Sequence, residues 1–260
     1  MSQLRVSLVQ QPLLWHDPKG NRAHFGSILA PLAGRTDLVI LPETFSTGFS
    51  MEVEALGEVA AGPSVDWLRA QAATLDAAVT GSVITREGTR YYNRLLWALP
   101  SGEVRHYDKR HLFRMGREHE HFTAGDAAWS LNWRGMRICP LVCYDLRFPV
   151  FSRRRADLDY DLLIYIANWP TARVEAWKLL LRARAIENQA FVVGVNRIGL
   201  DGNGVAYPGE SAAIDYLGRT QVCLDDAAGV ATTALDAAAL TAFREKFPAH
   251  LDADRFTLEL

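Results

Sequence analysis

The chain has 260 residues, of which 49% are hydrophobic and 22% are charged, and its formal net charge at pH 7 is -2. This ordinary globular composition excludes disordered and fibrous proteins, and the lack of a basic excess argues against a nucleic-acid-binding protein. The one basic run, residues 153–155, is short, and we expect it to lie on a solvated helix face. No stretch approaches the roughly 18 apolar residues of a membrane-spanning helix. The first residues carry no targeting pattern, so we expect a cytoplasmic location.

Apolar runs typical of strands alternate along the chain with segments of helical period. Strands are expected at residues 4–10, 37–41, 78–85, 91–99, 104–107, 131–133, 136–142, 162–167, 191–196, 212–214, 222–224 and 230–235. Helices are expected at residues 21–32, 65–75, 173–188 and 237–246. This mixture predicts a layered α/β fold in which sheets and helices pack face to face. No linker or repeat divides the chain, which favours a single domain over residues 1–260, with a core at about 5–235 and a C-terminal tail at 236–260.

The three cysteines, Cys139, Cys143 and Cys223, are too few and too odd in number for the disulfide framework of a secreted protein. Cys139 lies within the strand expected at 136–142, and Cys143 directly follows it. Four residues along a strand span about 13 Å, whereas a disulfide needs Cα atoms within about 7 Å. We therefore expect free thiols and a reducing compartment.

Three reactive side chains follow expected strands at or near their ends. Glu43 comes after Pro42 and the strand at 37–41, Lys109 comes shortly after the strand at 104–107, and Cys143 marks a sharp change from apolar to polar residues. Strand ends are rigid and open into crevices, so they are favoured positions for functional groups in α/β proteins. Taken singly, each residue also has an ordinary interpretation, as a small buried cysteine or a solvated loop charge.

Five segments together resemble the nitrilase superfamily of carbon–nitrogen hydrolases, in order and in approximate spacing. They are Leu41-Pro42-Glu43, Asp108-Lys109-Arg110-His111-Leu112-Phe113, Cys143-Tyr144-Asp145-Leu146-Arg147-Phe148-Pro149, Arg182-Ala183-Arg184-Ala185-Ile186-Glu187-Asn188-Gln189 and Gly194-Val195-Asn196-Arg197. One such motif would be weak evidence, whereas five in order are highly specific. The resemblance covers about residues 5–235. It implies an α-β-β-α four-layer sandwich that pairs with a second subunit, as a homodimer or a higher homo-oligomer.

The resemblance also implies roles for individual residues. Cys143 is similar to the nucleophile of the family, Glu43 to its general base and Lys109 to its transition-state stabiliser. Hydrolysis of an amide becomes easier when it is divided into two acyl transfers through a covalent thioester. Glu43 would take the thiol proton, give it to the departing ammonia and then activate the water that attacks the thioester. This scheme needs no metal and no organic cofactor.

A second glutamate lies seven residues before a glycine in this family. Glu118 stands in that position before Gly125, and it would orient the amide nitrogen or Lys109. Glu120 is the alternative, and Glu118 is the preferred match. The backbone N–H of Tyr144 would join Lys109 in stabilising the oxyanion of the tetrahedral intermediate.

Residues 41–49 and Asn168-Trp169-Pro170 resemble the omega-amidase branch, which acts on small 2-oxo dicarboxylate monoamides such as 2-oxoglutaramate. The anionic end of such a substrate would need a cation. Arg147 and Arg173 are candidates, although Arg147 could instead form a structural ion pair with Asp145.

Three aromatic residues, Phe45, Phe113 and Trp169, are candidates for the walls of a small substrate pocket. Their alternative interpretation is ordinary core packing, which is the commonest use of aromatic side chains.

Other classes of protein fit parts of the sequence. Four histidines cluster near Glu118 and Glu120, which suggests a zinc hydrolase, but the His-Glu-x-x-His and Cys-x-x-Cys motifs are absent. The histidines are His106, His111, His119 and His121. A scaffold that kept the fold without catalysis is a second alternative, although all four expected catalytic residue types are present. Among enzymes, a carbamoylase or another amidase is the alternative to an omega-amidase.

Overall fold

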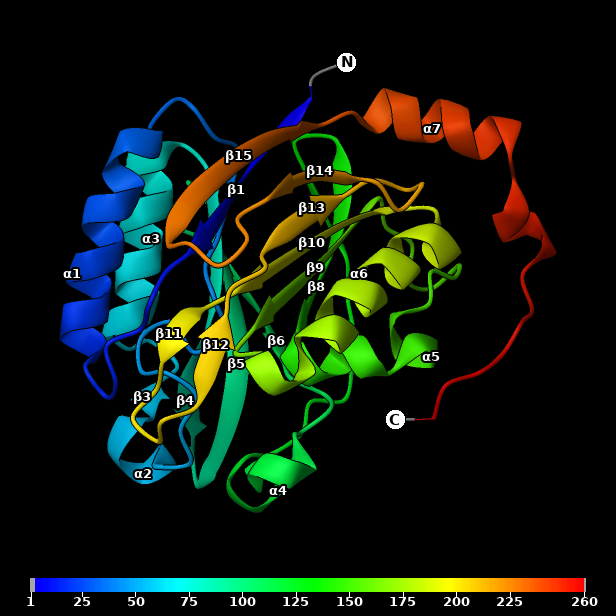
Figure 1. The fold of residues 1–260 in the computed structure, drawn as a ribbon. Helices are drawn as coiled ribbons and strands as arrows, with labels where there is room; N and C mark the ends of the chain where they lie inside the picture. Colours follow the sequence, from blue (N-terminus) through cyan, green and yellow to red (C-terminus); the bar gives the residue numbers. More distant parts are fainter. Residues whose placement is uncertain (1–2, 260) are drawn as a thin grey trace.

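The computed structural model describes residues 3–259, and two large β-sheets lie face to face at its centre (Figure 1). One sheet contains, in spatial order, β15 (Gly229–Leu235), β1 (Leu4–Gln10), β2 (Leu38–Ile40), β4 (Ala78–Glu87), β5 (Arg90–Ala98) and β6 (Val104–Asp108), with β3 (Glu58–Val59) paired to β4. The other sheet contains β14 (Thr220–Cys223), β13 (Ala212–Ile214), β10 (Phe191–Asn196), β9 (Leu162–Ala167), β8 (Met136–Val142) and β7 (Leu131–Trp133). β11 (Ile198–Leu200) and β12 (Ala206–Pro208) form a separate hairpin.

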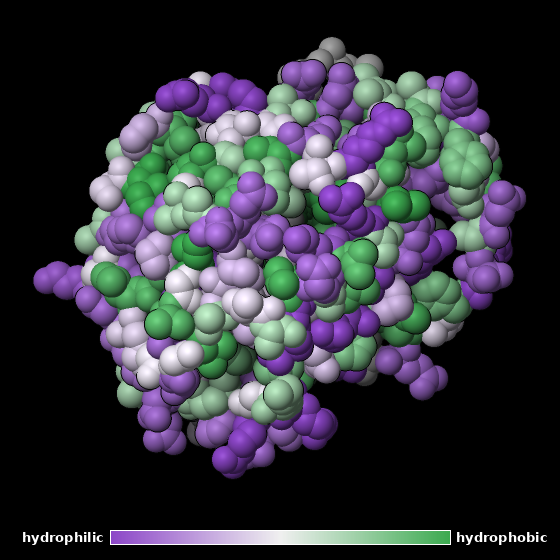
Figure 2. All heavy atoms as spheres, in the orientation of Figure 1, coloured by the Kyte–Doolittle hydropathy of each residue, from purple (hydrophilic) through white to green (hydrophobic). Residues whose placement is uncertain are grey.

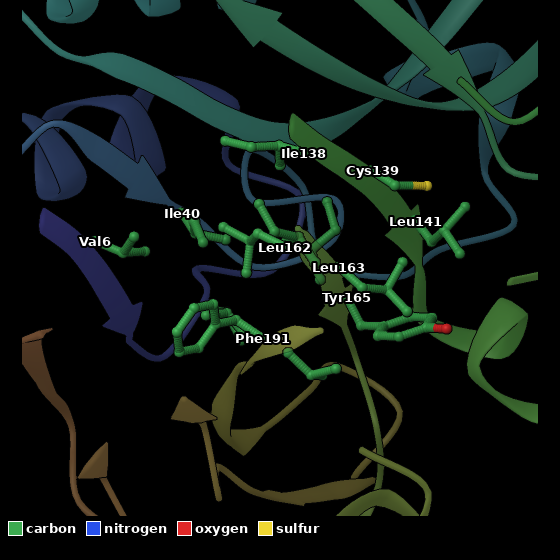
Figure 3. Close-up of a cluster of buried hydrophobic side chains, with 14 of the residues drawn as sticks. Val6, Ile40, Ile138, Cys139, Leu141, Leu162, Leu163, Tyr165 and Phe191 are labelled. Carbon is green, nitrogen blue, oxygen red and sulfur yellow. The ribbon is translucent and has the colours of Figure 1, made fainter. Parts of the chain in front are cut away.

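Alternation along the strands divides the apolar side chains of the first sheet between two cores, because successive side chains point to opposite faces. In β2, Leu38 and Ile40 belong to the core between the sheets, whereas Val39 belongs to the core on the outer face. In β5, Trp97 belongs to the central core and Leu96 to the outer one. Figure 3 shows part of the central core, where side chains from β1, β2, β8, β9 and β10 meet.

Helices cover the outer faces of both sheets and complete four layers (Figure 1). α1 (Pro18–Leu29) and α3 (Pro63–Leu75) cover the first sheet, and α6 (Val174–Asn188) covers the second, with α5 (Pro149–Ser152) beside it. The expected α-β-β-α sandwich is confirmed. The remaining helical elements are α2 (Val53–Leu56), α4 (Glu118–His121), α7 (Ala237–Lys246) and the 3₁₀ helices η1 (Ala30–Leu32), η2 (Arg114–Gly116), η3 (Cys143–Arg147), η4 (Thr171–Arg173) and η5 (Ala249–Asp252).

Capping chemistry sets the start of α1. The helix begins at Pro18, earlier than the expected residue 21, because proline fits the first turn. In addition, the Asp17 carboxylate accepts a hydrogen bond from the backbone N–H of Gly20. The prediction of a solvated helix face at residues 153–155 is wrong, because α5 ends at Ser152 and the chain continues in extended form.

Parallel strands bring distant segments to one edge of the two sheets. β2 runs parallel to β1 and β4, and β9 runs parallel to β8 and β10. Glu43 comes shortly after β2, Cys143 follows β8, and Asn168 follows β9. Because the carboxyl ends of parallel strands open into a crevice, this arrangement gathers the three residues around one site.

The cysteines are unpaired, as the sequence predicts. Cys139, Cys143 and Cys223 are all free, and Cys139 is buried inside β8. Figure 2 shows hydrophilic and hydrophobic side chains intermingled over the face that Figure 1 presents. Within residues 3–259, no helix combines the length and the apolar character needed to cross a membrane.

Candidate active site

A buried ammonium group joins two carboxylates at this edge of the sheets. Lys109 follows β6, and its Nζ donates hydrogen bonds to Glu43 Oε1 at 2.9 Å and to the two Glu118 oxygens at 3.0 and 2.9 Å. Lys109 is 1% exposed, and both glutamates are fully buried. Charges at this depth are tolerated when they are paired and hydrogen-bonded. The three side chains therefore form one interdependent group, which we call the ion cluster.

The ion cluster contains two carboxylates but only one ammonium group. The extra carboxylate affects the pKa values of Lys109 and Glu118. Burial alone would lower the pKa of Lys109, but Glu118 and Glu43 outweigh burial and raise it. Burial raises the pKa of Glu118, and Glu43 adds to that rise while Lys109 opposes it. Lys109 is therefore a cation at neutral pH, and Glu118 holds a proton more readily than a solvated glutamate does.

Amide groups of Asn93, in β5, and of Asn168, directly after β9, fix the orientation of Glu43. Asn93, in β5, donates from Nδ2 to Glu43 Oε1 at 2.8 Å. The backbone N–H of Asn168 donates to Glu43 Oε2 at 2.7 Å, and its Nδ2 donates to the Glu43 carbonyl at 2.8 Å. A carboxylate held in this way is ready to act without rearrangement of its neighbours.

The structure decides between Glu118 and Glu120, the two candidates for the second glutamate. Glu118 contacts Lys109 and also accepts a hydrogen bond from the backbone N–H of Phe113 at 2.5 Å. Glu120 lies at the surface and pairs with Arg117 at 2.6 Å. Glu118, the preferred residue, is therefore the one that belongs to the ion cluster.

Cys143 occupies a strained turn between β8 and η3. Its φ is +45°, in the left-handed region that residues other than glycine rarely adopt. Asp145 holds this turn, because its carboxylate accepts hydrogen bonds from the Val142 backbone N–H at 3.0 Å and the Tyr107 hydroxyl at 2.7 Å. The same carboxylate accepts from the His111 backbone N–H at 3.0 Å and contacts His111 Nδ1 at 2.7 Å. Strain of this kind persists where the surrounding structure enforces it, and it is common at functional sites.

The Cys143 thiol lies beside the ion cluster, which acts on its protonation. Burial raises the pKa of Cys143, Glu43 raises it further, and Lys109 opposes the rise without cancelling it. The thiol is therefore protonated at neutral pH. Because the thiolate is the nucleophilic form, attack by this sulfur requires a base that removes its proton.

A cavity of about 410 Å³ opens onto these groups. Glu43, Lys109 and Cys143 all line it. Its volume lies within the range of about 300–1,000 Å³ that is typical of small-ligand pockets. The cavity therefore gives a small molecule access to the thiol and to the ammonium at the same time.

Aromatic side chains form part of the cavity wall. Phe113 and Trp169 line it, as expected, and the ring of Tyr144 lies beside them. The rings of Phe113 and Tyr144 contact each other edge to face, with centroids 5.2 Å apart. Phe49, which the sequence analysis did not select, also lines the cavity, and its ring centroid lies 5.2 Å from Lys109 Nζ.

The prediction that Phe45 walls the pocket is wrong. Phe45 is fully buried in the outer core, and its ring centroid lies 5.8 Å from that of Phe25 and 5.4 Å from that of Trp67. Thr44, between Glu43 and Phe45, has a left-handed φ of +45°. The chain therefore turns at Thr44, so that Glu43 faces the cavity and Phe45 faces the helices.

Two cations line the cavity without a carboxylate partner among residues 3–259. The Arg147 guanidinium lies 5.1 Å from the ring centroid of Trp169, and that of Arg173 lies 5.1 Å from the ring centroid of Phe113. The alternative ion pair between Arg147 and Asp145 is absent, because the Asp145 oxygens are occupied by the groups that hold the turn. Both arginines are available to an anionic ligand.

The four histidines near the second glutamate do not converge on one point. His111 contacts Asp145, and His119 lies 4.0 Å from Glu120. In the described part of the chain, the one group of three metal-ligand side chains in mutual proximity is a different one, and it contains no histidine. Its members are Glu210, Cys223 and Asp225.

The sequence matches a family model over most of its length. Residues 5–245 match the model described as carbon-nitrogen hydrolase. The chain belongs to the carbon–nitrogen hydrolase family. It is 48% identical over 259 residues to the omega-amidase YafV of Escherichia coli (strain K12). The aligned region covers 99% of this chain and 100% of that protein. The resemblance to the nitrilase superfamily and its omega-amidase branch is thus confirmed.

Two further relatives of this carbon–nitrogen hydrolase agree with that result. The 2-oxoglutaramate amidase of Bacillus subtilis (strain 168) is 29% identical over 246 residues, which cover 94% of this chain and 95% of that protein. A crystal structure of XC1258 from Xanthomonas campestris is described as a CN-hydrolase superfamily protein with an arsenic adduct in the active site. It matches with a TM-score of 0.97 and 55% identity, covering 99% of this chain and 100% of that one.

Three residues that shape the site of this hydrolase were not selected from the sequence. Asn168 directly follows β9, so the rule that selected Cys143 at the end of β8 would have found it. Asp145 lies two residues after Cys143, in η3. Asn93 is a polar residue in the middle of β5, where a buried amide demands a partner. Its partner, Glu43, lies 50 residues away in the chain, which no local pattern reveals.

Replacing Gly125 with alanine is expected to destabilise this hydrolase by about 1–3 kcal/mol, as other overpacked sites are destabilised. A Cβ at Gly125 would lie 2.1 Å from the backbone oxygen of Asp108. The backbone N–H of Gly125 also donates to the carbonyl of Lys109 at 3.0 Å, so the clash would disturb the segment that positions the ammonium. Urea denaturation measures the loss.

The matched control for this substitution is Gly26→Ala in α1. The new Cβ there would have Trp67 Nε1, at 3.8 Å, as its nearest neighbour, which is an ordinary contact. Alanine is favoured over glycine in a helix by roughly 0.5–1 kcal/mol, so this variant should be at least as stable as the original. Equal stability of the Gly125→Ala and Gly26→Ala variants would contradict the argument from close approach.

Proposed function

We propose that this protein is an omega-amidase that hydrolyses the terminal amide of a short 2-oxo dicarboxylate monoamide, such as 2-oxoglutaramate, and releases ammonia. The observation that carries the proposal is the buried ion cluster of Glu43, Lys109 and Glu118 beside Cys143, on the wall of a cavity of small-molecule size. Similarity over nearly the whole chain to the omega-amidase YafV and to 2-oxoglutaramate amidase supports the substrate class.

The reaction begins when Glu43 removes the thiol proton of Cys143. Burial keeps this thiol neutral until the base acts, and the hydrogen bonds from Asn93 and Asn168 hold the base in place. The sulfur then attacks the amide carbon, a carbon–sulfur bond forms, and the carbonyl π electrons move onto the oxygen. The oxyanion develops beside Lys109, which stabilises it in a site of low dielectric.

Collapse of the tetrahedral intermediate breaks the carbon–nitrogen bond. Glu43 gives its proton to the nitrogen, ammonia departs, and a thioester remains on Cys143. Glu43 then takes a proton from a water molecule, whose oxygen attacks the thioester carbon. The carbon–sulfur bond breaks, Glu43 returns the proton to the sulfur of Cys143, and the acid is released. The backbone N–H of Tyr144, in the first turn of η3, acts with Lys109 as a second oxyanion donor, because first-turn N–H groups lack helical acceptors. Glu118 holds Lys109 in position throughout.

Arg147 and Arg173 are the groups that bind the anionic end of the substrate in this proposal. Both line the cavity and neither has a carboxylate partner among the described residues, so each has guanidinium donors available. The planar guanidinium matches a carboxylate through two parallel hydrogen bonds. The walls formed by Phe113 and Trp169 are suited to the short carbon chain between the two ends.

Substituting either arginine with glutamine, Arg147→Gln or Arg173→Gln, should raise KM for 2-oxoglutaramate by roughly 10–100-fold, because a hydrogen bond to a charged group contributes about 1.5–3 kcal/mol. The kcat should change little, because the arginines bind the end of the substrate that does not react. A neutral amide of similar length serves as the matched control, and its KM should stay near that of the unmodified enzyme. An equal rise in KM for both substrates would show that the arginines support the structure rather than the carboxylate.

Steady-state ammonia release tests the proposed function directly. The panel contains 2-oxoglutaramate, a neutral amide, an aliphatic nitrile and a carbamoyl compound. The proposal predicts the highest kcat/KM for 2-oxoglutaramate. Preference for the carbamoyl compound would identify a carbamoylase instead, and no ammonia from any compound with folded protein would favour the non-catalytic scaffold. The homo-oligomeric state and the cytoplasmic location stay predictions from the resemblance and from composition.

A further inference from the structure

A second cavity, of about 490 Å³, lies at the opposite end of the strands that carry the catalytic groups. Arg137, near the start of β8, lines it, whereas Cys143 follows the end of the same strand. Six residues of strand span about 20 Å, so the two sites are well separated. α7 and the residues after it supply the other side of the cavity, including Arg244, Pro248 and Leu251.

The wall of this cavity carries more positive than negative charge. Asp161 Oδ1 accepts hydrogen bonds from Arg137 Nη2 at 2.8 Å and from Arg244 Nη1 at 2.6 Å. Asp159 Oδ1 accepts from Arg154 Nε at 2.7 Å, and the other Asp159 oxygen pairs with Arg137. Three guanidinium groups thus share two carboxylates, which leaves one positive charge uncompensated within the network.

Of the three arginines, Arg154 has the fewest hydrogen-bond partners for its guanidinium group. The Arg154 side chain is only 13% exposed. Among residues 3–259, Nε is its only side-chain atom that makes a hydrogen bond, so Nη1 and Nη2 have no partner there. Arg244 differs, because its Nε donates to the Gln189 carbonyl and its Nη2 donates to the Tyr160 carbonyl. A mostly buried guanidinium with unused terminal donors is costly unless a ligand or water accepts from it.

The pKa values of two residues that line the cavity, Arg154 and His250, reflect the same excess of positive charge. Burial lowers the pKa of Arg154 to about 10, and the neighbouring Arg244 and Arg137 act in the same direction. Burial also lowers the pKa of His250, which lines the cavity, and Arg154 and Arg244 again add to the effect. An anion in the cavity would oppose both shifts.

Two further acidic groups face this region. Glu245 lines the cavity, but it is exposed and forms no ion pair within the described residues. Asp252 raises the pKa of His250, although not enough to offset burial and the arginines. Neither group pairs with the terminal nitrogens of Arg154, so these donors have no partner among residues 3–259, and Arg154 lines the cavity.

We propose that this cavity binds a small organic oxyanion, whose carboxylate or phosphate group is held by Nη1 and Nη2 of Arg154. The guanidinium fork matches both kinds of oxyanion through paired hydrogen bonds. Pro248 and Leu251 give the cavity an apolar side, which suits an anion with a carbon skeleton. The site is separate from the catalytic cavity and independent of the proposed amidase activity.

Calorimetric titration of the full-length protein tests the site. Inorganic phosphate and succinate are titrated separately, with the ionic strength held constant by sodium chloride, so that the two arms distinguish the phosphate group from the carboxylate. We expect saturable binding of at least one of them, and this binding should persist in Arg147→Gln, which lacks one anion-binding arginine of the catalytic cavity. Arg154→Gln should weaken binding by about 10-fold or more, because it removes a charge-assisted pair of hydrogen bonds. Arg153→Gln, which removes the same charge from the neighbouring residue outside the cavity, should leave binding unchanged.

Three results would overturn the proposal. The first is the absence of saturable binding for both anions, and the second is unchanged binding to Arg154→Gln. The third is loss of binding in Arg147→Gln, which would place the anion in the catalytic cavity. If Arg154→Gln fails to fold, Arg154→Lys decides the matter, because it keeps the charge beside Asp159 but lacks the fork. Weaker binding to the lysine variant supports the site, and equal binding contradicts it.

Discussion

Cys143→Ala is expected to lower kcat for ammonia release by roughly 10⁴-fold or more, since removal of a catalytic nucleophile eliminates the covalent route. Residual turnover would come from binding and from the oxyanion donors around Lys109, which the substitution leaves in place. The thiol is partly buried and makes no strong hydrogen bond, so its loss should affect stability little. A sensitive ammonia assay, with circular dichroism to verify folding, measures both effects.

Cys223→Ala is the matched control for this prediction. Cys223 is also a free and partly buried cysteine, but it contacts Glu210 at 3.8 Å and does not line the catalytic cavity. The control should retain the full rate. Comparable activity of both variants would show that the reaction does not use the thiol of Cys143.

Lys109→Met should lose both stability and catalysis. The substitution leaves Glu43 and Glu118 buried together without a cation, and breaking a buried ion pair typically costs about 3–5 kcal/mol. It also removes an oxyanion donor, which lowers kcat by about 10²–10³-fold at comparable sites. Urea denaturation measures the first loss, and ammonia release under conditions where the variant stays folded measures the second.

The double variant Lys109→Met with Glu118→Gln separates these two losses. The second substitution removes one of the uncompensated carboxylates, so part of the stability should return, while the rate should stay low because the ammonium is still missing. The gain is a coupling between the two sites, of the kind that neighbouring groups in one network show. A Lys109→Met variant as stable as the unmodified protein would contradict the interdependence of Glu43, Lys109 and Glu118.

The strand ends explain why so much of the site was predictable. Glu43 and Cys143 each come shortly after an apolar strand, Lys109 directly follows the more polar β6, and the pairing of the strands then brings such ends together. The core followed from the same alternation, as Leu38 and Val39 show by facing opposite sides of β2. These features depend on local residue order, which the sequence contains directly.

The features that were mispredicted depend on backbone turns and on distant partners. Phe45 was expected in the pocket, but the left-handed turn at Thr44 directs it into the outer core, and Phe49 lies on the cavity wall instead. Arg154 was expected on a solvated helix face, yet it pairs with Asp159 in a partly buried network. Neither the positive φ of Thr44 nor the ion pair between Arg154 and Asp159 produces a periodic pattern in the sequence, so neither could be predicted from it.

Mass spectrometry of the protein quenched in acid during turnover of 2-oxoglutaramate tests the central claim most directly. The account predicts a fraction of chains heavier by the acyl group, with the added mass located by peptide mapping on Cys143 and absent from Cys143→Ala. An acyl group on any other residue, or ammonia release at the full rate by Cys143→Ala, would contradict it.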